Sequence, residues 1–187
     1  MNLKYIDYFA SEHKKQIKDI YVNSFPKDER FPFWILKNCS KEKNVLFNVI
    51  LDNSKVIGME YIINYENTAY LMYLVIDENQ RGKGYGSKIL EDLIKKYETI
   101  ILSIERPNKD LDDNREMRKK FYLRNGFFET NKFIQDNSIE YEILCTNKDY
   151  DITKEDLEKR YIKMTRSTIM KFLIGRIFNV YNICFIE

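Results

Sequence analysis

The chain has 187 residues, a formal net charge of +2 at pH 7 and an ordinary globular composition, apart from its 14 tyrosines and 12 phenylalanines. This length suits one domain with a sizeable core, and the near-neutral charge gives no reason to expect binding to nucleic acid. Cys39, Cys145 and Cys184 are too scattered for a zinc motif or a disulfide framework, so we expect reduced thiols and no metal site. The apolar runs are too short for a signal peptide or a membrane span, which favours a cytoplasmic protein.

The N-terminal part of the chain predicts a strand and two helices. Residues 3–8 alternate as a strand, and Ser11 can cap a helix whose apolar face ends before Pro26. A loop then leads to a short helix over residues 35–39. An aromatic cluster lies on this loop, and it comprises Phe25, Phe31, Phe33 and Trp34. It is either a satellite hydrophobic cluster or one wall of a substrate pocket, and core packing is the more common role of aromatic side chains.

The middle of the chain predicts a three-stranded meander that is followed by a helix. Residues 45–51 and 55–65 are two strands of a hairpin, because the residues between them, Asp52-Asn53-Ser54, favour a turn. Residues 70–76 are apolar on both faces, which indicates a strand that is covered on both sides. The apolar positions of residues 87–97 then recur at helical spacing.

The segment Arg81-Gly82-Lys83-Gly84-Tyr85-Gly86 joins this strand to this helix. Glycine lacks the Cβ atom that would keep a ligand away from the backbone. The first N–H groups of the following helix have no partner within the helix, and the helix dipole makes this end positive. Since Arg81 and Lys83 carry further positive charge, we predict a phosphate-binding cradle. Its spacing differs from that of a P-loop and of a Rossmann fingerprint.

The second half of the chain predicts a parallel strand, a helix and a closing hairpin. Residues 99–105 form an apolar strand, which should be parallel to residues 70–76 because a helix connects the two. A helix over residues 114–124 follows, and then a hairpin with strands at 127–133 and 139–145. Together these elements predict an α/β (α+β) fold with a mixed, mostly antiparallel central sheet that helices flank.

The C-terminal residues predict a helical appendage, which divides the chain into residues 1–148 and 149–187. Thr153 and Asp156 suit a capping box at the start of one helix, and Ser167 can begin a second. Every charged residue from 159 to 176 is basic. A basic amphipathic segment packs on the protein body, forms a homodimer contact or lies on a membrane surface, and packing or dimerisation is the more common outcome.

Two motifs resemble those of the GCN5-related N-acetyltransferases, the GNAT family. Arg81, Gly84 and Gly86 fit the Arg/Gln-x-x-Gly-x-Gly/Ala loop with which that family binds the pyrophosphate of acetyl-CoA. Phe121-Tyr122 and Gly126-Phe127 fit the end of a late helix of the family. The two motifs occur in the family's order, with a strand between them, so the chain is expected to share the GNAT fold.

This resemblance covers residues 3 to about 146 and implies acetyl-CoA as the co-substrate. It also implies a set of binding residues at the end of the third meander strand, in the cradle and at the start of the late helix: Leu74, Val75, Ile76, Arg81, Gly82, Lys83, Gly84, Tyr85, Gly86 and Asn114. Many members carry an asparagine, seven residues before the motif tyrosine, that contacts the CoA arm. Here that position is Arg115, with Asn114 one place earlier, so the sequence leaves open which of the two contacts CoA.

Transfer of an acetyl group to an amine needs a base, an oxyanion site and an acid. A lysine-like amine, with a pKa of about 10.4, must lose a proton near neutral pH, directly or through water. Glu60 and Glu105 flank the predicted site as candidate general bases, and each also suits an exposed or ion-paired carboxylate. The resemblance assigns the general acid to Tyr122, whose alternative role is a core aromatic. It places an oxyanion-binding N–H of a bulged strand within residues 74–76.

We therefore predict an N-acetyltransferase that moves an acetyl group from acetyl-CoA to a primary amine by direct attack. An acyl-enzyme is not expected, since none of the cysteines lies in the cradle. The acceptor stays open between a small amine, an aminoglycoside-like compound, a polyamine and a peptide N-terminus. The alternatives are a non-catalytic acyl-CoA-binding regulatory module and a protein that its basic C-terminal segment tethers to a membrane or a partner.

Overall fold

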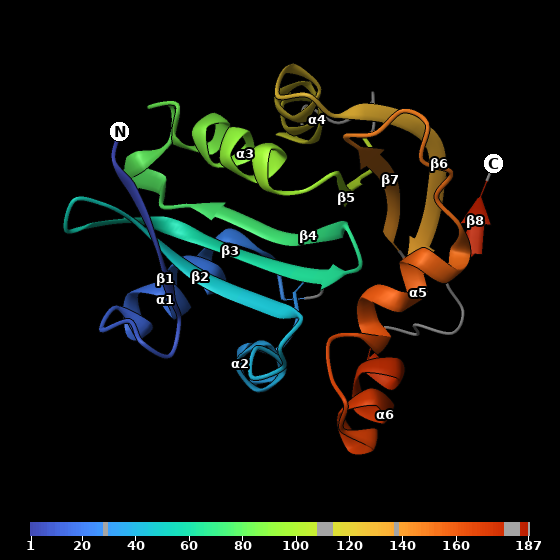
Figure 1. Cartoon of the computed structure of the whole chain (residues 1–187), viewed down its shortest axis with the longest axis horizontal. Coiled ribbons are helices and arrows are strands. Elements are labelled where there is room, and N and C mark those ends of the chain that lie inside the picture. The colour runs from blue at the N-terminus through green and yellow to red at the C-terminus, as the bar shows by residue number, and fades with distance from the viewer. Residues whose placement is uncertain (28–29, 108–113, 137–138, 178–183, 187) are drawn as a thin grey trace.

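The computed structural model describes residues 1–27, 30–107, 114–136, 139–177 and 184–186. In this part of the chain, eight strands form one sheet in the order β1-β2-β3-β4-β5-β7-β6-β8 (Figure 1). The strands are β1 Leu3–Asp7, β2 Val45–Asp52, β3 Lys55–Tyr65, β4 Thr68–Ile76, β5 Thr99–Glu105, β6 Phe128–Asp136, β7 Ile139–Cys145 and β8 Cys184–Ile186. Only the β4–β5 pair is parallel among these described strands, so the predicted mixed, mostly antiparallel sheet is confirmed.

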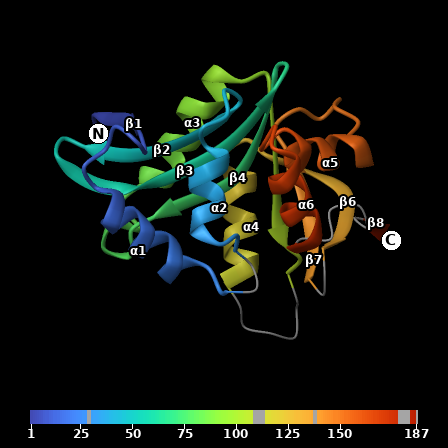
Figure 2. The same cartoon turned by 90° about the horizontal axis from the view of Figure 1, so that it is seen from below.

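Helices cover both faces of the sheet (Figures 1 and 2). They are α1 Lys14–Ser24, α2 Phe33–Cys39, the 3-10 helix η1 Glu78–Gln80, α3 Tyr85–Lys96, α4 Asn114–Arg124, α5 Lys154–Ile162 and α6 Thr168–Ile177. α1 and α2 pack on one face through what we call the α1 core, which includes Ile17, Tyr21 and Phe47. α3 packs on the other face through the α3 core, which includes Ile89 and Leu102. Within the described ranges, no helix has the length and apolarity needed to cross a membrane.

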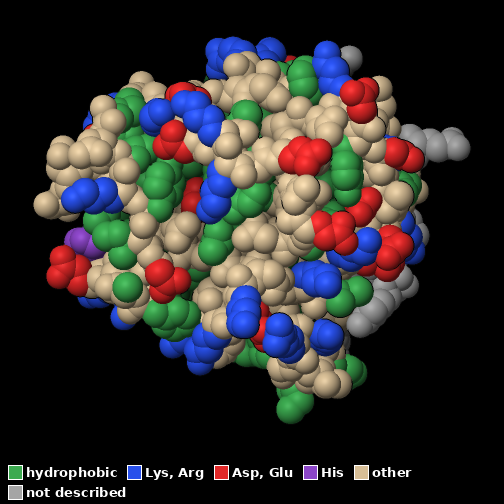
Figure 3. All heavy atoms as spheres, viewed as in Figure 1, with side chains coloured by type: hydrophobic (Ala, Val, Ile, Leu, Met, Phe, Trp, Pro, Cys, Tyr) green, Lys and Arg blue, Asp and Glu red, His purple; other side chains and the backbone are tan. Residues whose placement is uncertain are grey.

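The C-terminal segment is packed against the body of the protein. Its contribution to the α1 core comprises Ile152, Leu157, Tyr161, Met164 and Ile174. β8 pairs with β6, and no pattern in the sequence predicted this strand. Several Lys and Arg side chains gather on the surface near α2 and α6 (Figure 3). The predicted division at residue 148 stays a prediction, and residues 178–183 and 187 of the predicted appendage lie outside the described part.

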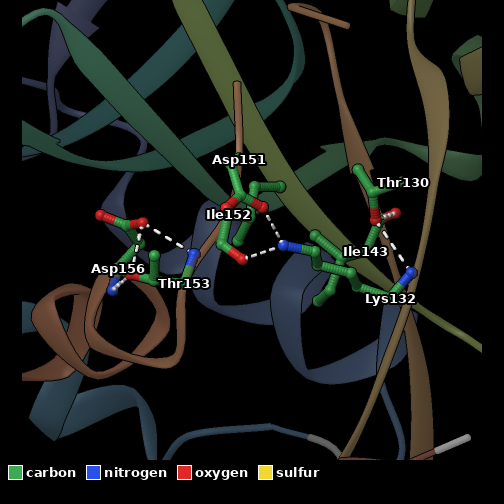
Figure 4. A network of polar contacts seen from close by, with 7 residues as sticks. All are labelled: Thr130, Lys132, Ile143, Asp151, Ile152, Thr153 and Asp156. Carbon is green, nitrogen blue, oxygen red and sulfur yellow. Dashed lines mark hydrogen bonds and ion pairs between the residues drawn. The ribbon is translucent and has the colours of Figure 1, made fainter. Parts of the chain in front are cut away.

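Polar contacts hold the start of this segment (Figure 4). Thr153 Oγ1 accepts the N–H of Asp156, and the Asp156 carboxylate accepts the N–H of Thr153, which confirms the predicted capping box. Lys132 on β6 donates to the Asp151 carboxylate and to the carbonyl oxygen of Ile152. The residues that enter α5 are therefore bound to the sheet through a side chain of β6.

The predicted cap of the first helix is wrong. α1 begins at Lys14, because the Ser11 Oγ accepts the N–H of His13 at 3.1 Å in a local turn. The second predicted helix start in the C-terminal segment is confirmed within one residue. α6 begins at Thr168, and the Ser167 Oγ accepts the N–H of Met170 at 3.3 Å.

β4 and β5 pair only briefly before they diverge (Figure 2). Thr68–Tyr70 pairs with Thr99–Ile101, and the register within the described residues goes no further. β4 continues beyond Tyr70 to Ile76, and over the residues after Tyr70 the edge that faces β5 makes no backbone pairing with it. An extended ligand can hydrogen-bond to such an edge as an added strand does.

β4 also contains a β-bulge. Leu71 pairs with Ile62 on β3 and Tyr73 pairs with Tyr61, so Met72 is an extra residue on β4. Met72 and Tyr73 consequently both pack against the α1 core. The bulge shifts the alternation of side chains along β4 just before the predicted CoA-binding residues 74–76.

Candidate active site

The glycine cradle lies at the N-terminus of α3. Gly84 precedes the helix with φ of +82°, a conformation that strains any residue with a Cβ atom, and no side chain caps the helix. The first N–H groups of α3 are therefore available to an anion. The Tyr85 hydroxyl donates to Asp52 Oδ2 at 2.9 Å, so the side chain of Tyr85 is bound elsewhere and only its backbone can serve the cradle.

The two cations of the cradle are held by neutral oxygens. Arg81 donates from Nε to the carbonyl of Ile76 at 3.1 Å and from Nη2 to Ser24 Oγ at 3.5 Å. The Lys83 ammonium donates to the carbonyl of Asn79 at 2.7 Å and to a side-chain oxygen of Gln80. Both side chains are exposed, so both charges can act on a bound phosphate.

Gly86 brings the cradle close to α4. A Cβ atom there would lie 2.9 Å from Cζ of Phe121, so α3 and α4 approach each other closely only because this residue is glycine. The two motifs of the sequence, which are 35 residues apart between Gly86 and Phe121, are therefore in contact. Asn114 begins α4 with an exposed side chain, whereas Arg115 donates from Nε to Glu105 at 2.6 Å.

Leu74, Val75 and Ile76 form the end of β4 next to the cradle. On one edge they pair with residues 58–60 of β3. On the other edge, β5 has already diverged. The β5-facing edge of Leu74 and Val75 and the first N–H groups of α3 are therefore both available to a ligand, and η1 lies between them along the chain.

A cavity of about 110 Å³ lies on the α1-core face of the sheet, beside the diverging strands. Side chains of β4, β5, α4, β7 and α5 line it, together with Phe25 and Phe31 from the loop before α2. Phe33 packs against the α1 core instead, and Trp34 is half exposed. Phe25, Phe31 and Phe33 thus belong to or pack against the α1 core, as the first interpretation predicts, and a role of Phe25 and Phe31 in a substrate pocket stays a prediction.

Glu105 lies on the wall of this cavity. Its side chain is buried, and the ion pair with Arg115 holds its carboxylate. Arg118 of α4 and Arg160 of α5 line the same cavity. Neither arginine was predicted as a site residue, because their proximity to Glu105 depends on long-range packing.

Glu60 lies on the opposite face of the sheet and does not line the cavity. It pairs with Leu74, whose side chain packs against the α3 core. Asn48 donates to Glu60 Oε1 at 2.9 Å, and Oε2 has no hydrogen-bond partner within the described residues. Burial to 2% exposure raises the pKa of this carboxyl, an effect that the Asn48 hydrogen bond opposes. The structure therefore does not bring the two candidate bases together.

Tyr122 lies on α4, one turn after Arg118, but it packs against the α3 core and, unlike Arg118 and Glu105, does not line the cavity. Its ring packs edge-on against Phe121 and Phe127, with centroid distances of 5.3 and 5.5 Å. Burial raises the pKa of the hydroxyl to about 12, although the Arg118 charge lowers it in part. The phenol is therefore protonated at neutral pH and can donate a hydrogen bond or a proton.

No group of three or more His, Cys, Asp and Glu side chains suited to a metal occurs in the described ranges. The arrangement instead combines an anion cradle, a free strand edge, a buried carboxylate and a protonated phenol. These groups suit the binding of an extended phosphate-bearing molecule and proton transfer beside it.

Comparison with known proteins shows which acetyltransferases this chain is similar to. Residues 43–129 match the model of a family described as the acetyltransferase (GNAT) domain. The predicted acetyltransferase YjbC of Bacillus subtilis (strain 168) is 33% identical over 63 residues, which are 34% of this chain and 32% of YjbC. The chain thus matches about a third of the length of this curated relative.

Solved structures share the fold over more of the chain. A predicted GNAT-family acetyltransferase from Bacteroides thetaiotaomicron is 22% identical, with a TM-score of 0.69, over 95% of this chain and 98% of that one. An aminoglycoside 6'-N-acetyltransferase in complex with coenzyme A is 15% identical, with a TM-score of 0.64, over 82% and 100% of the two chains. The ribosomal-protein-S18-alanine N-acetyltransferase of Escherichia coli has a TM-score of 0.59 at 15% identity, over 81% and 99%.

The Bacteroides structure covers 95% of this chain, so the part that it leaves uncovered is shorter than the segment of residues 149–187. Part of the C-terminal segment therefore has a structural counterpart there. These likenesses concern the fold alone.

Proposed function

We propose that this chain is a GNAT-family acetyltransferase, and that it transfers an acetyl group from acetyl-CoA to a primary amine by direct attack. The observation that carries the proposal is the combination of an unpaired edge of β4 with the glycine cradle of α3, which follows β4 along the chain. One extended ligand can occupy both, with amide groups along the strand and phosphates at the helix N-terminus.

In this proposal the cradle binds the pyrophosphate of acetyl-CoA. The backbone N–H groups around Gly84 and Gly86 donate to phosphate oxygens, and Arg81 and Lys83 neutralise their charge. Residues 74–76 hydrogen-bond the pantetheine arm and present an N–H to the oxyanion that forms at the thioester carbonyl. Asn114, exposed at the start of α4, is free to contact the arm, whereas Arg115 is engaged by Glu105.

Glu105 is the general base that the geometry supports best. Its side chain is buried on the wall of the 110 Å³ cavity. Residues of both diverging strands, β4 and β5, line this cavity. A carboxylate in this place accepts a proton from an incoming ammonium directly or through water. Glu60 could act only through the sheet, because it lies on the other face.

Tyr122 is proposed as the group that stabilises the departing thiolate. Its pKa of about 12 lies above the value of about 8.5 for a thiol, so a hydrogen bond from the phenol to the thiolate is favoured over complete proton transfer. The nitrogen–carbon bond of the amide forms and the carbon–sulfur bond breaks. The ammonium loses two protons in all: one passes to Glu105, and the second, lost from the nitrogen after attack, protonates the thiolate through water, so that CoA leaves as the thiol.

Two measurements test the proposal. Calorimetric titration of CoA should show binding, and a free-thiol assay should show acetyl-CoA consumption that depends on an added primary amine. Binding without thiol release, across small amines, polyamines, aminoglycosides and peptide N-termini, would instead favour a non-catalytic acyl-CoA-binding module. Absence of CoA binding by the folded protein would refute both functions.

A further inference from the structure

Helix α5, in the C-terminal segment, forms one wall of the cavity beside the proposed thioester site. It contributes Arg160 and Tyr161. Arg160 is only 3% exposed, and its guanidinium donates to the hydroxyl of Tyr70, to Ser103 Oγ at 3.0 Å and to the hydroxyl of Tyr161 at 3.0 Å. A charged side chain buried this deeply, with several specific hydrogen bonds, has a fixed position.

This position is the point where the two central strands separate. Tyr70 is the last residue of β4 that pairs with β5, and Ser103 lies two residues beyond Ile101, the last paired residue of β5. The oxygen atoms of Tyr70 and Ser103 are 2.6 Å apart, so they bridge the strands, and Arg160 binds both. Arg160 therefore lines the part of the cavity where β4 and β5 separate.

The charges that line the cavity favour an acidic group on its ligand. Glu105 is already paired with Arg115, whereas Arg118 is exposed and makes no ion pair with any described residue. A guanidinium binds a carboxylate with two parallel hydrogen bonds, which gives orientation as well as affinity. Arg118 lines the same cavity as Glu105 and is exposed, so it is suited to hold a carboxylate of a ligand that enters from solvent.

The size of the cavity favours a compact ligand. Its volume of about 110 Å³ is well below the roughly 300–1,000 Å³ of pockets that enclose drug-sized molecules. Aromatic side chains such as Phe25, Phe31 and Tyr161 form much of its remaining wall. A molecule of a few non-hydrogen atoms fits this space, and an aminoglycoside does not.

We infer, on the basis of the proposed function, that the acceptor is a compact amine that also carries a carboxylate, as a small amino acid does. Arg118 binds the carboxylate while the amine faces Glu105. Arg160 is a positioning residue, which holds Tyr70, Ser103 and Tyr161 and so fixes the part of the cavity wall that they form. The C-terminal segment thereby takes part in the selection of the acceptor.

Matched pairs of amines test this inference in steady-state acetyl transfer. Glycine, L-alanine and β-alanine are each compared with their own carboxamide, which has nearly the same shape but no negative charge. Since hydrogen bonds to charged groups are worth more than neutral ones, at least one amino acid should exceed its carboxamide in kcat/KM by about tenfold to a hundredfold.

Three variants assign this preference to residues. Arg118→Met should abolish the preference for the amino acid over its carboxamide, through a higher KM for the amino acid. Because Arg118 is exposed, this substitution should leave the fold stable. Arg160→Met should raise the acceptor KM while the Kd for CoA stays unchanged. Arg166→Met, an exposed arginine of the same segment that does not line the cavity, is the matched control and should change neither.

Two further results separate a failure of this inference from a failure of the proposed function. Efficient acetylation of the carboxamides or of larger amines, unaffected by Arg118→Met, would overturn the inference while the acetyltransferase function stands. Thiol release with no amine at all would overturn both. If Arg160→Met does not fold, Tyr161→Phe serves in its place, because it removes one of the Arg160 hydrogen bonds and keeps the ring.

Discussion

Replacement of Tyr122 by phenylalanine tests the chemistry of the site with the smallest structural change. The variant keeps the ring and its edge-on contacts with Phe121 and Phe127, so the fold and the cradle should be unaffected. Only the hydroxyl that is proposed to stabilise the departing thiolate is lost. We expect turnover to fall by about a hundredfold, the lower end of the usual range for a lost general acid.

The magnitude follows from the pKa of the group. Because burial raises the pKa of the Tyr122 hydroxyl to about 12, this hydroxyl is a weaker acid than the CoA thiol and assists mainly by hydrogen bonding. A hundredfold loss corresponds to about 2.7 kcal/mol of transition-state stabilisation, which is in the range of a hydrogen bond to a charged group.

The pKa of the Tyr122 hydroxyl also determines how stability and turnover should depend on pH. A pKa raised from about 10 to about 12 means that the folded protein keeps this proton more tightly than the unfolded chain. The associated stability is complete below about pH 10 and is lost as the pH rises towards 12. Tyr122 should therefore cause no alkaline decline of turnover between pH 6 and 9.

The assay is thiol release at saturating acetyl-CoA and acceptor, combined with calorimetric measurement of the Kd for CoA. The Kd should stay within about twofold, because the cradle is untouched. Tyr97→Phe is the control, since the Tyr97 hydroxyl is buried without a hydrogen-bond partner in the described part of the chain. An unchanged rate in Tyr122→Phe would remove this residue from the mechanism.

Three further predictions concern the cradle, the base and the C-terminal segment. Gly84→Val should weaken CoA binding by about tenfold or more in calorimetry, because φ is +82° and valine is strained there, and equal affinity would exclude the cradle. Glu105→Gln should lower turnover by about a hundredfold with the Kd for CoA unchanged, whereas a larger loss in Glu60→Gln would reverse the assignment of the base. Leu157→Ala should reduce the free energy of unfolding by about 2–5 kcal/mol, because the Leu157 side chain is fully buried, with 0% exposure. Ile169→Ala should reduce it by less than about 0.5 kcal/mol, because the Ile169 side chain is 73% exposed. Equal small losses in chemical denaturation would show that the segment is not packed.

The secondary structure could be predicted largely from local patterns. The strands at 55–65, 99–105 and 139–145 and the helix at 114–124 have the predicted bounds. Periodicity and turn residues act within a few positions, so they are visible in the sequence. β8 was missed because a strand of only three residues, Cys184–Ile186, carries no period and forms through its long-range pairing with β6.

The cradle and the cavity differ in how far the sequence could predict them. The cradle is one continuous segment, so its residues could be named from the sequence. The cavity draws on separate elements: Arg160 meets Ser103 across 57 positions and Tyr70 across 90. The choice between Glu60 and Glu105 needs the sheet register, because these two carboxylates lie on opposite faces.

The structure also changes the interpretation of the basic C-terminal segment. Read as a sequence, its positive charge suits a membrane surface or an acidic partner. Three of its cations are already engaged within the protein, since Arg160 is buried beside the sheet, Lys159 pairs with Glu155 and Arg166 pairs with Glu42. Charge alone is therefore weak support for a tether. That hypothesis has to depend on the exposed apolar side chains of α6, whereas α5 has a role that its buried contacts already define.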